Sequence, residues 1–432
     1  MMLALGIDLG TSGVRTAVLD ETGRLVSQAS VEMPAPELFN GRPVQDPMIW
    51  WKAVATCLEK QIALLREARR DPKTIVGVAV DGTSGSMLLC DAELRPCTPG
   101  YMYNSAGFTE QAERIGGIAP PESHGRGAGS GLARALFLLT LPGADQAKHL
   151  VHQADWIAAR LAGRAGFSDQ NNVLKTGFDL NRQEWPGWLD TLGVPEGILP
   201  AVFQPGAVVE NISQEMATRF ELSDECKIHA GTTDSIAAFL ATGASEPGDA
   251  VTSLGTTLVI KLVSKADVRD PDAGVYSHRL GDRWLPGGAS NSGGGALLRH
   301  FSLEQMAAMT PMVRSERLLD YGFYPLPGKG ERFPVCDPAK ESNHSPQPTE
   351  DHLFFQGLLE GIARIEKQAY DHLAKLGGAY PARVFTVGGG AGNKPWCEIR
   401  QKILGVPVIA CTETIAAAGT ARLVLDHWVA GD

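Results

Sequence analysis

The chain has 432 residues, a length that suits two or three domains of roughly 150 residues each. Hydrophobic residues make up 44% and charged residues 20%, a globular composition that excludes an intrinsically disordered chain. The formal net charge of −10 argues against nucleic acid or an anionic membrane as the main partner. No apolar run reaches the ~18 residues of a membrane span. Seven scattered cysteines without CxxC spacing favour a reducing compartment, so we expect a cytoplasmic protein.

The first eighty residues predict a mixed α/β sheet. Three short strands joined by tight turns are expected over 3–8, 15–20 and 25–31. Asp46 and Pro47 mark the start of an amphipathic helix, as its N-cap and first residue. The β-branched run 74–80 predicts a strand that is buried on both faces.

The second half of the chain repeats the opening. The segment DAVTSLGTTLVIKLVS echoes ALGIDLGTSGVRTAVLD, and its Gly255-Thr256-Thr257 corresponds to Gly10-Thr11-Ser12 at an offset of 245. Chance similarity is the alternative for so short a match. The repeat predicts two like-folded domains, over 1–242 and 243–432. Later elements are expected as a helix over 353–376, a strand over 383–387, helices over 393–404 and 415–428, and a polar surface loop over 328–351.

Two carboxylates follow predicted strands and are candidates for chemistry. Asp8 lies beside the small turn Gly10, Thr11 and Ser12, whose N–H groups and hydroxyls can face phosphate oxygens, while the carboxylate can hold Mg²⁺ through water. Asp234 follows a second small turn and could act as a general base for a hydroxyl that attacks a phosphoryl group. The alternatives are an ordinary hairpin for Asp8 and a charge that complements a helix dipole for Asp234.

Two further motifs suggest ligand contacts. Asp81 and Ser84 end the strand 74–80, where α/β sheets bind ligands, and could contact a polyol or simply cap a turn. Gly388, Gly389, Gly390 and Asn393 lie between a strand and a helix, so a base or phosphate could approach the backbone closely. This run is neither GxGxxG nor GxxxxGK[ST], which weakens a Rossmann or Walker interpretation.

Taken together, these motifs resemble the FGGY carbohydrate kinases, within the actin-like ATPase superfamily. The resembling pieces are GIDLGTSGVRTAVLD, VAVDGTSGSMLLCD, AGTTDSIAAFLATGA, SLGTTLVIKL, PLPGKGERFP, FTVGGGAGNKPWCEIRQKILGVPV and TETIAAAGTA, in family order across the chain. The resemblance implies two actin-like (ribonuclease H-like) α/β domains, each with a mixed sheet, and ATP and sugar in the cleft between them. The N-terminal domain would be the sugar and phosphate side and the C-terminal domain the ATP side, with the last helix able to pack back on the first.

The resemblance also implies roles for individual residues. Asp234 corresponds to the catalytic base. Asp8 corresponds to the magnesium and substrate carboxylate, and Ser84 to a turn that reaches the sugar, with Asp81 beside it. The phosphate and ATP ligands correspond to Gly10, Thr11, Ser12, Gly255, Thr256, Thr257, Gly388, Gly389, Gly390 and Asn393. One segment departs from the family, because Tyr103-Asn104-Ser105-Ala106 stands where larger pentulose kinases carry a Trp-x-Asp-x-Arg segment.

The short chain resembles the compact ribulose or xylulose kinase-like branch of the family. We therefore expect an ATP- and Mg²⁺-dependent kinase that phosphorylates the primary hydroxyl of a small ketose, with D-ribulose first and D-xylulose second. The alternatives are another polyol kinase of the family, a non-catalytic sugar and ATP sensor, and a superfamily ATPase without a sugar acceptor. Sugar and ATP are the expected partners, without nucleic acid or membrane, for a monomer or homodimer.

Overall fold

In the computed structural model, which describes residues 2–411 and 414–425, the chain divides into two units. The described part of unit 1 comprises residues 2–241, 279–282 and 415–425, and that of unit 2 comprises residues 242–278, 283–411 and 414. No helix within the described residues is long and apolar enough to cross a membrane.

Unit 1 is built on a mixed sheet with the strand order β12-β13-β6-β1-β2-β3, and β14 pairs with β6 as well. β1 pairs antiparallel with β2 and parallel with β6, so the predicted mixed α/β sheet is confirmed. The strands are β1 (Leu3–Leu9), β2 (Gly13–Asp20), β3 (Leu25–Glu32), β6 (Ile75–Gly82), β12 (Val208–Asn211), β13 (Lys227–His229) and β14 (Thr232–Thr233).

Helices cover both faces of this sheet. Alternate residues of a strand point to opposite sides, so each strand contributes buried side chains to both faces. Leu5 and Ile7 of β1 belong to the same buried cluster as Trp50 and Leu58 of α1 (Pro47–Glu67). Asp46 caps α1 and Pro47 is its first residue, as the sequence predicts.

The opposite face of β1 is covered by α12 (Ala416–Leu425), which also packs against α7 (Asp234–Ala241). A Cβ on Gly6 would lie 1.9 Å from the carbonyl oxygen of Ala417, so only glycine lets α12 approach this closely. The expected helix over 415–428 is thus observed as far as Leu425, and residues 426–428 lie outside the described residues.

The rest of unit 1 forms a five-stranded sheet, a two-stranded sheet and short helices. The larger of these sheets has the order β4-β5-β8-β7-β9. Its strands are β4 (Glu37–Phe39), β5 (Arg42–Gln45), β7 (Met87–Cys90), β8 (Gly100–Tyr101) and β9 (His149–His152). The two-stranded sheet pairs β10 (Phe167–Asp169) with β11 (Ala201–Phe203). The helices are α2 (Thr109–Gly116), α3 (Gly131–Leu138), α4 (Gln153–Ala162), α5 (Trp188–Thr191) and α6 (Gln214–Arg219).

The sheet of unit 2 repeats the pairing of unit 1. β15 (Asp249–Leu254) pairs antiparallel with β16 (Leu258–Leu262) and parallel with β19 (Arg383–Val387), as β1 pairs with β2 and β6. Its order is β17-β18-β16-β15-β19-β20, with β17 (Tyr276–Leu280), β18 (Arg283–Ser290) and β20 (Val408–Ala410). The repeated motif therefore corresponds to a repeated strand topology.

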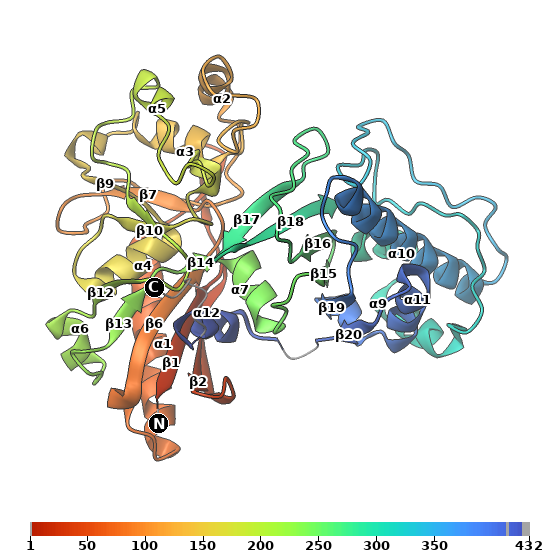
Figure 1. Ribbon diagram of the computed structural model, residues 1–432, viewed down its shortest axis with the longest axis horizontal. Helices are drawn as coiled ribbons and strands as arrows, with labels where there is room; N and C mark the ends of the chain where they lie inside the picture. The colour runs from red at the N-terminus through yellow and green to blue at the C-terminus, as the bar shows by residue number, and fades with distance from the viewer. Residues whose placement is uncertain (1, 412–413, 426–432) are drawn as a thin grey trace. The chain divides into compact units, whose positions relative to one another are not determined.

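The α-helices in the described part of unit 2 are α8 (Gly294–Leu298), α9 (Leu303–Met309), α10 (Asp351–Lys375) and α11 (Lys394–Leu404). α10 and α11 pack against each other (Figure 1). Part of the polar loop over 328–351 is fixed to β18, because the buried Glu331 carboxylate accepts hydrogen bonds from Ser290 Oγ at 2.7 Å and from the Asn291 N–H at 2.7 Å.

Candidate functional site

Three carboxylates gather where neighbouring strands of unit 1 end. Asp8 on β1 is in register with Asp81 on β6, and Asp81 is in register with Thr232 on β14. All three strands run parallel, so their carboxyl ends meet at one edge of the sheet, which is where α/β sheets bind ligands. Asp234 follows β14 directly, and its charge acts on Asp81.

Asp234 is the first residue of α7 and is half-buried. Its Oδ1 accepts a hydrogen bond from the Ser235 N–H at 2.6 Å. The strand before it lies tightly against β6, because a Cβ on Gly231 would meet the carbonyl oxygen of Val80 at 1.8 Å. Glycine at this position therefore brings the carboxylate next to the end of β6.

Asp8 and Asp81 are a coupled pair of buried carboxyl groups. Burial raises the pKa of Asp8, whereas hydrogen bonding to Asp81 and the charge of Arg15, 3.5 Å away, lower it. Burial raises the pKa of Asp81 well above its usual range, and the charges of Asp8 and Asp234 raise it further. Asp81 is therefore the member of the pair whose protonated form the site favours more strongly.

Asp81 lies within β6 and has no exposed surface, so its carboxyl does not face solvent as the sequence analysis expected of a sugar ligand. Its Oδ2 accepts a hydrogen bond from Thr420 of α12, while its Oδ1 has no hydrogen-bond partner within the described residues. The Asp81 carboxyl is thus buried on the strand next to that of Asp8 and connects β6 to α12.

The turn Gly10, Thr11 and Ser12 joins β1 to β2, with Thr11 half-buried and Ser12 exposed. The Gly10 N–H donates to the Gly13 carbonyl at 3.0 Å. Thr11 and Ser12 thus follow the end of β1, the strand that carries Asp8, and their side chains are at least partly exposed to a ligand.

Ser84 lies in the turn between β6 and β7 and is the partly exposed member of an otherwise buried turn. The neighbouring Thr83 is fixed by Gln153, whose Oε1 accepts from the Thr83 hydroxyl at 2.8 Å and from its N–H at 3.1 Å. The turn therefore presents Ser84 on a rigid backbone.

In unit 2, a cavity of about 620 Å³ lies beside the second small turn. Of the residues predicted to bind ATP, Gly255, Thr256, Gly389, Gly390 and Asn393 line this cavity, whereas Thr257 and Gly388 do not. The turn is held by α8, since the N–H groups of Gly294 and Gly295 donate to the carbonyl oxygens of Gly255 and Thr256 at 2.8 and 2.9 Å. The sequence motifs of β15 and β19 thus meet at one cavity.

Apolar side chains that the sequence analysis missed form much of the cavity wall. Leu298, Leu303 and Met306 come from α8 and α9, and Leu303 is 73% exposed. Their only signal in the sequence is an ordinary amphipathic pattern. Asn393 caps α11 through its Oδ1, which accepts from the Trp396 N–H at 3.0 Å, and its Nδ2 donates to Thr310 Oγ1 at 3.4 Å.

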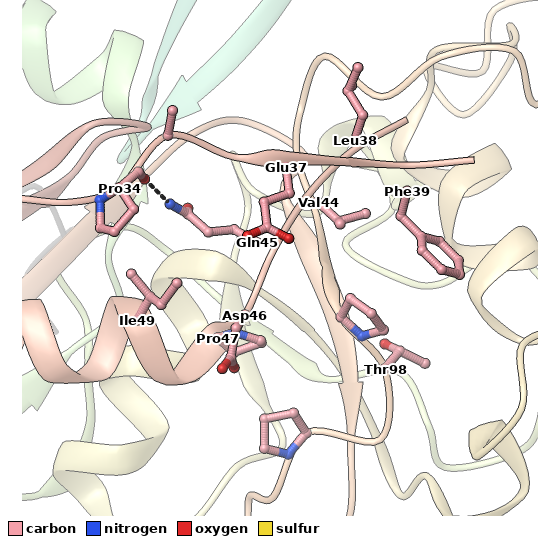
Figure 2. Close-up of a pocket in the computed structure, with 13 residues that line it drawn as sticks. Pro34, Glu37, Leu38, Phe39, Val44, Gln45, Asp46, Pro47, Ile49 and Thr98 are labelled. Atoms are coloured by element: carbon pink, nitrogen blue, oxygen red, sulfur yellow. Dashed lines mark hydrogen bonds between the residues drawn. The ribbon is translucent and has the colours of Figure 1, made fainter. Parts of the chain in front are cut away.

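A second cavity, of about 430 Å³, lies in unit 1 between β4, β5 and the start of α1 (Figure 2). Prolines and apolar side chains form most of its wall, and the Gln45 Nε2 donates to the Pro34 carbonyl at 2.7 Å inside it. None of the residues predicted from the sequence to bind substrate or ATP lines this cavity.

The loop after β10 is hydrogen-bonded to β14. Asn171 Nδ2 donates to Thr232 Oγ1 at 3.1 Å, and Asn172 Nδ2 donates to the Thr232 carbonyl at 3.2 Å. Both asparagines are in turn held by Asp169, which accepts from the Asn171 N–H at 2.8 Å and from Asn172 Nδ2 at 2.5 Å. These contacts fix the strand that leads into Asp234.

The buried Asp169 should make unfolding pH-dependent. Burial first, and then the charge of Asp155, raise the pKa of Asp169 from its usual 3.8 to about 7. The folded state therefore keeps a proton that the unfolded state has lost, and stability should fall as pH rises from about 4 towards 7. Because Asp169→Asn carries no titrating group, urea unfolding should find the variant gaining stability relative to the natural chain across this window. A constant difference between the two proteins would contradict the assignment.

Comparisons with known proteins agree on one family. Residues 3–116 match the N-terminal domain, and residues 250–425 the C-terminal domain, of the FGGY family of carbohydrate kinases. Xylulose kinase from Lactococcus lactis is 24% identical over 95% of this chain and 85% of its own length. Xylulose kinase from Escherichia coli is 24% identical over 97% of this chain and 89% of its own length. A crystal structure described as a xyloylose kinase from Brucella ovis superposes with a TM-score of 0.86 at 24% identity, covering 98% of this chain and 90% of that one.

Proposed function

Because the chain belongs to the FGGY family of carbohydrate kinases and is an ATP-dependent sugar kinase, we propose that its acceptor is a neutral open-chain ketopentose. D-ribulose is our first choice and D-xylulose the second. The relatives named xylulose kinases support a pentulose, and the Tyr103-Asn104-Ser105-Ala106 segment supports a departure from typical xylulose contacts.

The observation that carries this proposal is the meeting of Asp8 and Asp234 at one edge of the sheet of unit 1. Asp234 accepts the proton of the primary hydroxyl as that oxygen attacks the γ-phosphorus of ATP. The new O–P bond forms while the bond to the β-phosphate oxygen breaks, which releases ADP. Asp8 orients the sugar, Asp81 stands behind Asp8, and Ser84 contacts a sugar hydroxyl.

We assign the nucleotide to the 620 Å³ cavity of unit 2, with the base against its apolar wall and the phosphates at Gly255 and Thr256. Thr257 and Gly388 adjoin cavity-lining residues in the chain and are kept as candidate ATP ligands, and Gly10, Thr11 and Ser12 are kept as candidate phosphate ligands. Unit 1, which includes residues 415–425, then acts as the sugar and phosphate domain, and unit 2 acts as the ATP domain.

Asp8 also fits Mg²⁺ held through water. The described residues contain no cluster of three His, Cys, Asp or Glu side chains that could hold a metal ion by themselves. Mg²⁺ usually keeps several waters and takes one or two carboxylates together with substrate phosphates, so a single buried carboxylate beside a phosphate turn suits it. When bound, the ion would neutralise charge on the phosphates.

The proposal is tested by ADP release from the purified protein with ATP and Mg²⁺ over a panel of D-ribulose, D-xylulose, glycerol, D-glucose and D-gluconate. We expect the highest kcat/KM with a ketopentose. D-gluconate should be poor, because its carboxylate would approach Asp8 and Asp234. Turnover with a hexose or a polyol but with no pentulose would overturn the choice of substrate. Calorimetric sugar binding without ADP release would instead favour a sensor.

A further inference from the structure

The turn that carries Ser84 and the segment 103–105 are connected by one buried cation. Arg134, on α3, is 1% exposed. Its Nη1 donates to the Gly85 carbonyl at 2.5 Å, and its Nη2 donates to the carbonyls of Tyr103 and Ser105, both at 2.9 Å. A single planar guanidinium therefore holds together two stretches of backbone, at Gly85 and at Tyr103 to Ser105.

Carbonyl oxygens and the Phe108 ring, 5.7 Å from the Arg134 Cζ, surround this guanidinium in place of a carboxylate. Within the described residues Arg134 forms no ion pair, and its Nε has no hydrogen-bond partner. Burial lowers the pKa of the guanidinium to about 10, so it remains charged at neutral pH. A buried cation without a carboxylate is costly, and three carbonyl oxygens satisfy only part of its hydrogen-bonding capacity. An apolar side chain would fill the same space without this cost, which points to a role for the fixed geometry.

The two connected stretches present polar, uncharged side chains. Ser84 is half-buried, Tyr103 is 49% exposed and Asn104 is exposed. Their backbones are joined a second time by Ser86, whose Oγ accepts from the Tyr103 N–H at 2.8 Å. Hydroxyl and amide groups held in this way can donate to and accept from the hydroxyls of a neutral sugar.

We propose that Arg134 is a positioning residue for the sugar, which holds Ser84, Tyr103 and Asn104 in the one arrangement that recognises a neutral polyhydroxyl substrate. The inference rests on the proposed function, because that assigns Ser84 to the sugar. It adds Tyr103 and Asn104 as sugar contacts. Arg134 then fixes the position of these two residues relative to Ser84. These contacts would take the place of the acidic and basic side chains that this chain lacks in the segment 103–106.

The test compares the steady-state kinetics of Arg134→Met and Arg134→Lys with those of the natural chain. Arg134→Met should raise the KM for the sugar about tenfold to a hundredfold, the range expected for lost hydrogen bonds to a charged group. The KM for ATP should change less than about twofold, and kcat should fall less than the sugar KM rises. Arg134→Lys keeps the charge but not the planar fork, so its sugar KM should lie between those of the other two proteins.

Arg160→Met is the matched control. Arg160 is a half-buried arginine of unit 1 whose Nε, like that of Arg134, has no hydrogen-bond partner within the described residues, and its guanidinium lies 4.6 Å from the Trp51 ring centroid. It makes none of the contacts to the Ser84 turn, so this variant should lose stability without a change in the sugar KM. Equal rises in both KM values for the Arg134 variants, or an unchanged sugar KM, would overturn the inference.

Hydrogen exchange gives a second measurement that does not need activity. In Arg134→Lys, amides of residues 83–86 and 103–105 should exchange faster together, while amides of β1 should not change. Independent protection of the two stretches would contradict the positioning role even if Arg134→Met failed to fold. If the natural chain turned over no sugar, the proposed function would fail, and the exchange experiment would still decide whether Arg134 couples the two stretches.

Discussion

Replacing Asp234 with alanine or asparagine should lower kcat at least about a hundredfold, the usual scale for a positioned general base. The carboxylate begins α7 beside the ends of β1 and β6, and its removal leaves the attacking hydroxyl without a proton acceptor. ATP binding measured by calorimetry should remain near that of the natural chain, because the nucleotide is assigned to the cavity of unit 2.

Asp351→Asn is the matched control for this experiment. Asp351 is an exposed carboxylate in the first turn of α10 and complements that helix dipole without any assigned chemistry. Its substitution should leave kcat unchanged. If an Asp234 variant kept more than about a tenth of kcat, Asp234 would not be the general base. Its role would then be to complement the dipole of α7, as Asp351 does for α10.

Breaking the buried ion pair between Arg400 and Glu366 should destabilise unit 2 by about 3–5 kcal/mol. Both side chains are fully buried, with Arg400 Nε 2.6 Å from Glu366 Oε2 and Nη2 2.7 Å from Oε1. The pair joins α11 to α10, and Thr252 of β15 also donates to Glu366 at 2.5 Å. Arg400→Met would leave an uncompensated buried carboxylate, and urea unfolding should detect the loss.

Two controls separate charge from packing in this measurement. Lys367 and Asp371 pair at 2.8 Å on the same helix but are each about 40% exposed, so Lys367→Met should cost only about 0–1 kcal/mol. The double variant Arg400→Met with Glu366→Met should recover much of the lost stability, because a buried ion pair can often be replaced by apolar side chains. A double variant as unstable as Arg400→Met would instead assign the cost to packing.

Local patterns in the sequence were sufficient to predict most of the elements. The strand over 383–387 is observed with the same bounds, and the helix expected over 353–376 is observed as Asp351–Lys375. The family and its ATP-dependent sugar kinase activity also followed from short motifs. Strand ends and tight turns bring functional groups together within a few residues of the chain. The motifs are therefore short and can be recognised from the local sequence.

The sequence by itself therefore determined the elements, the duplicated topology and the candidate carboxylates. Only the tertiary structure decided that Asp81 is fully buried behind Asp8, with Thr420 of the last helix as its donor. It also brought Leu303 and Met306 to the wall of the unit 2 cavity and placed Arg134 between Gly85 and Tyr103. Burial and such contacts depend on which elements pack together, and packing involves side chains that are tens to hundreds of residues apart in the sequence, which no local pattern records.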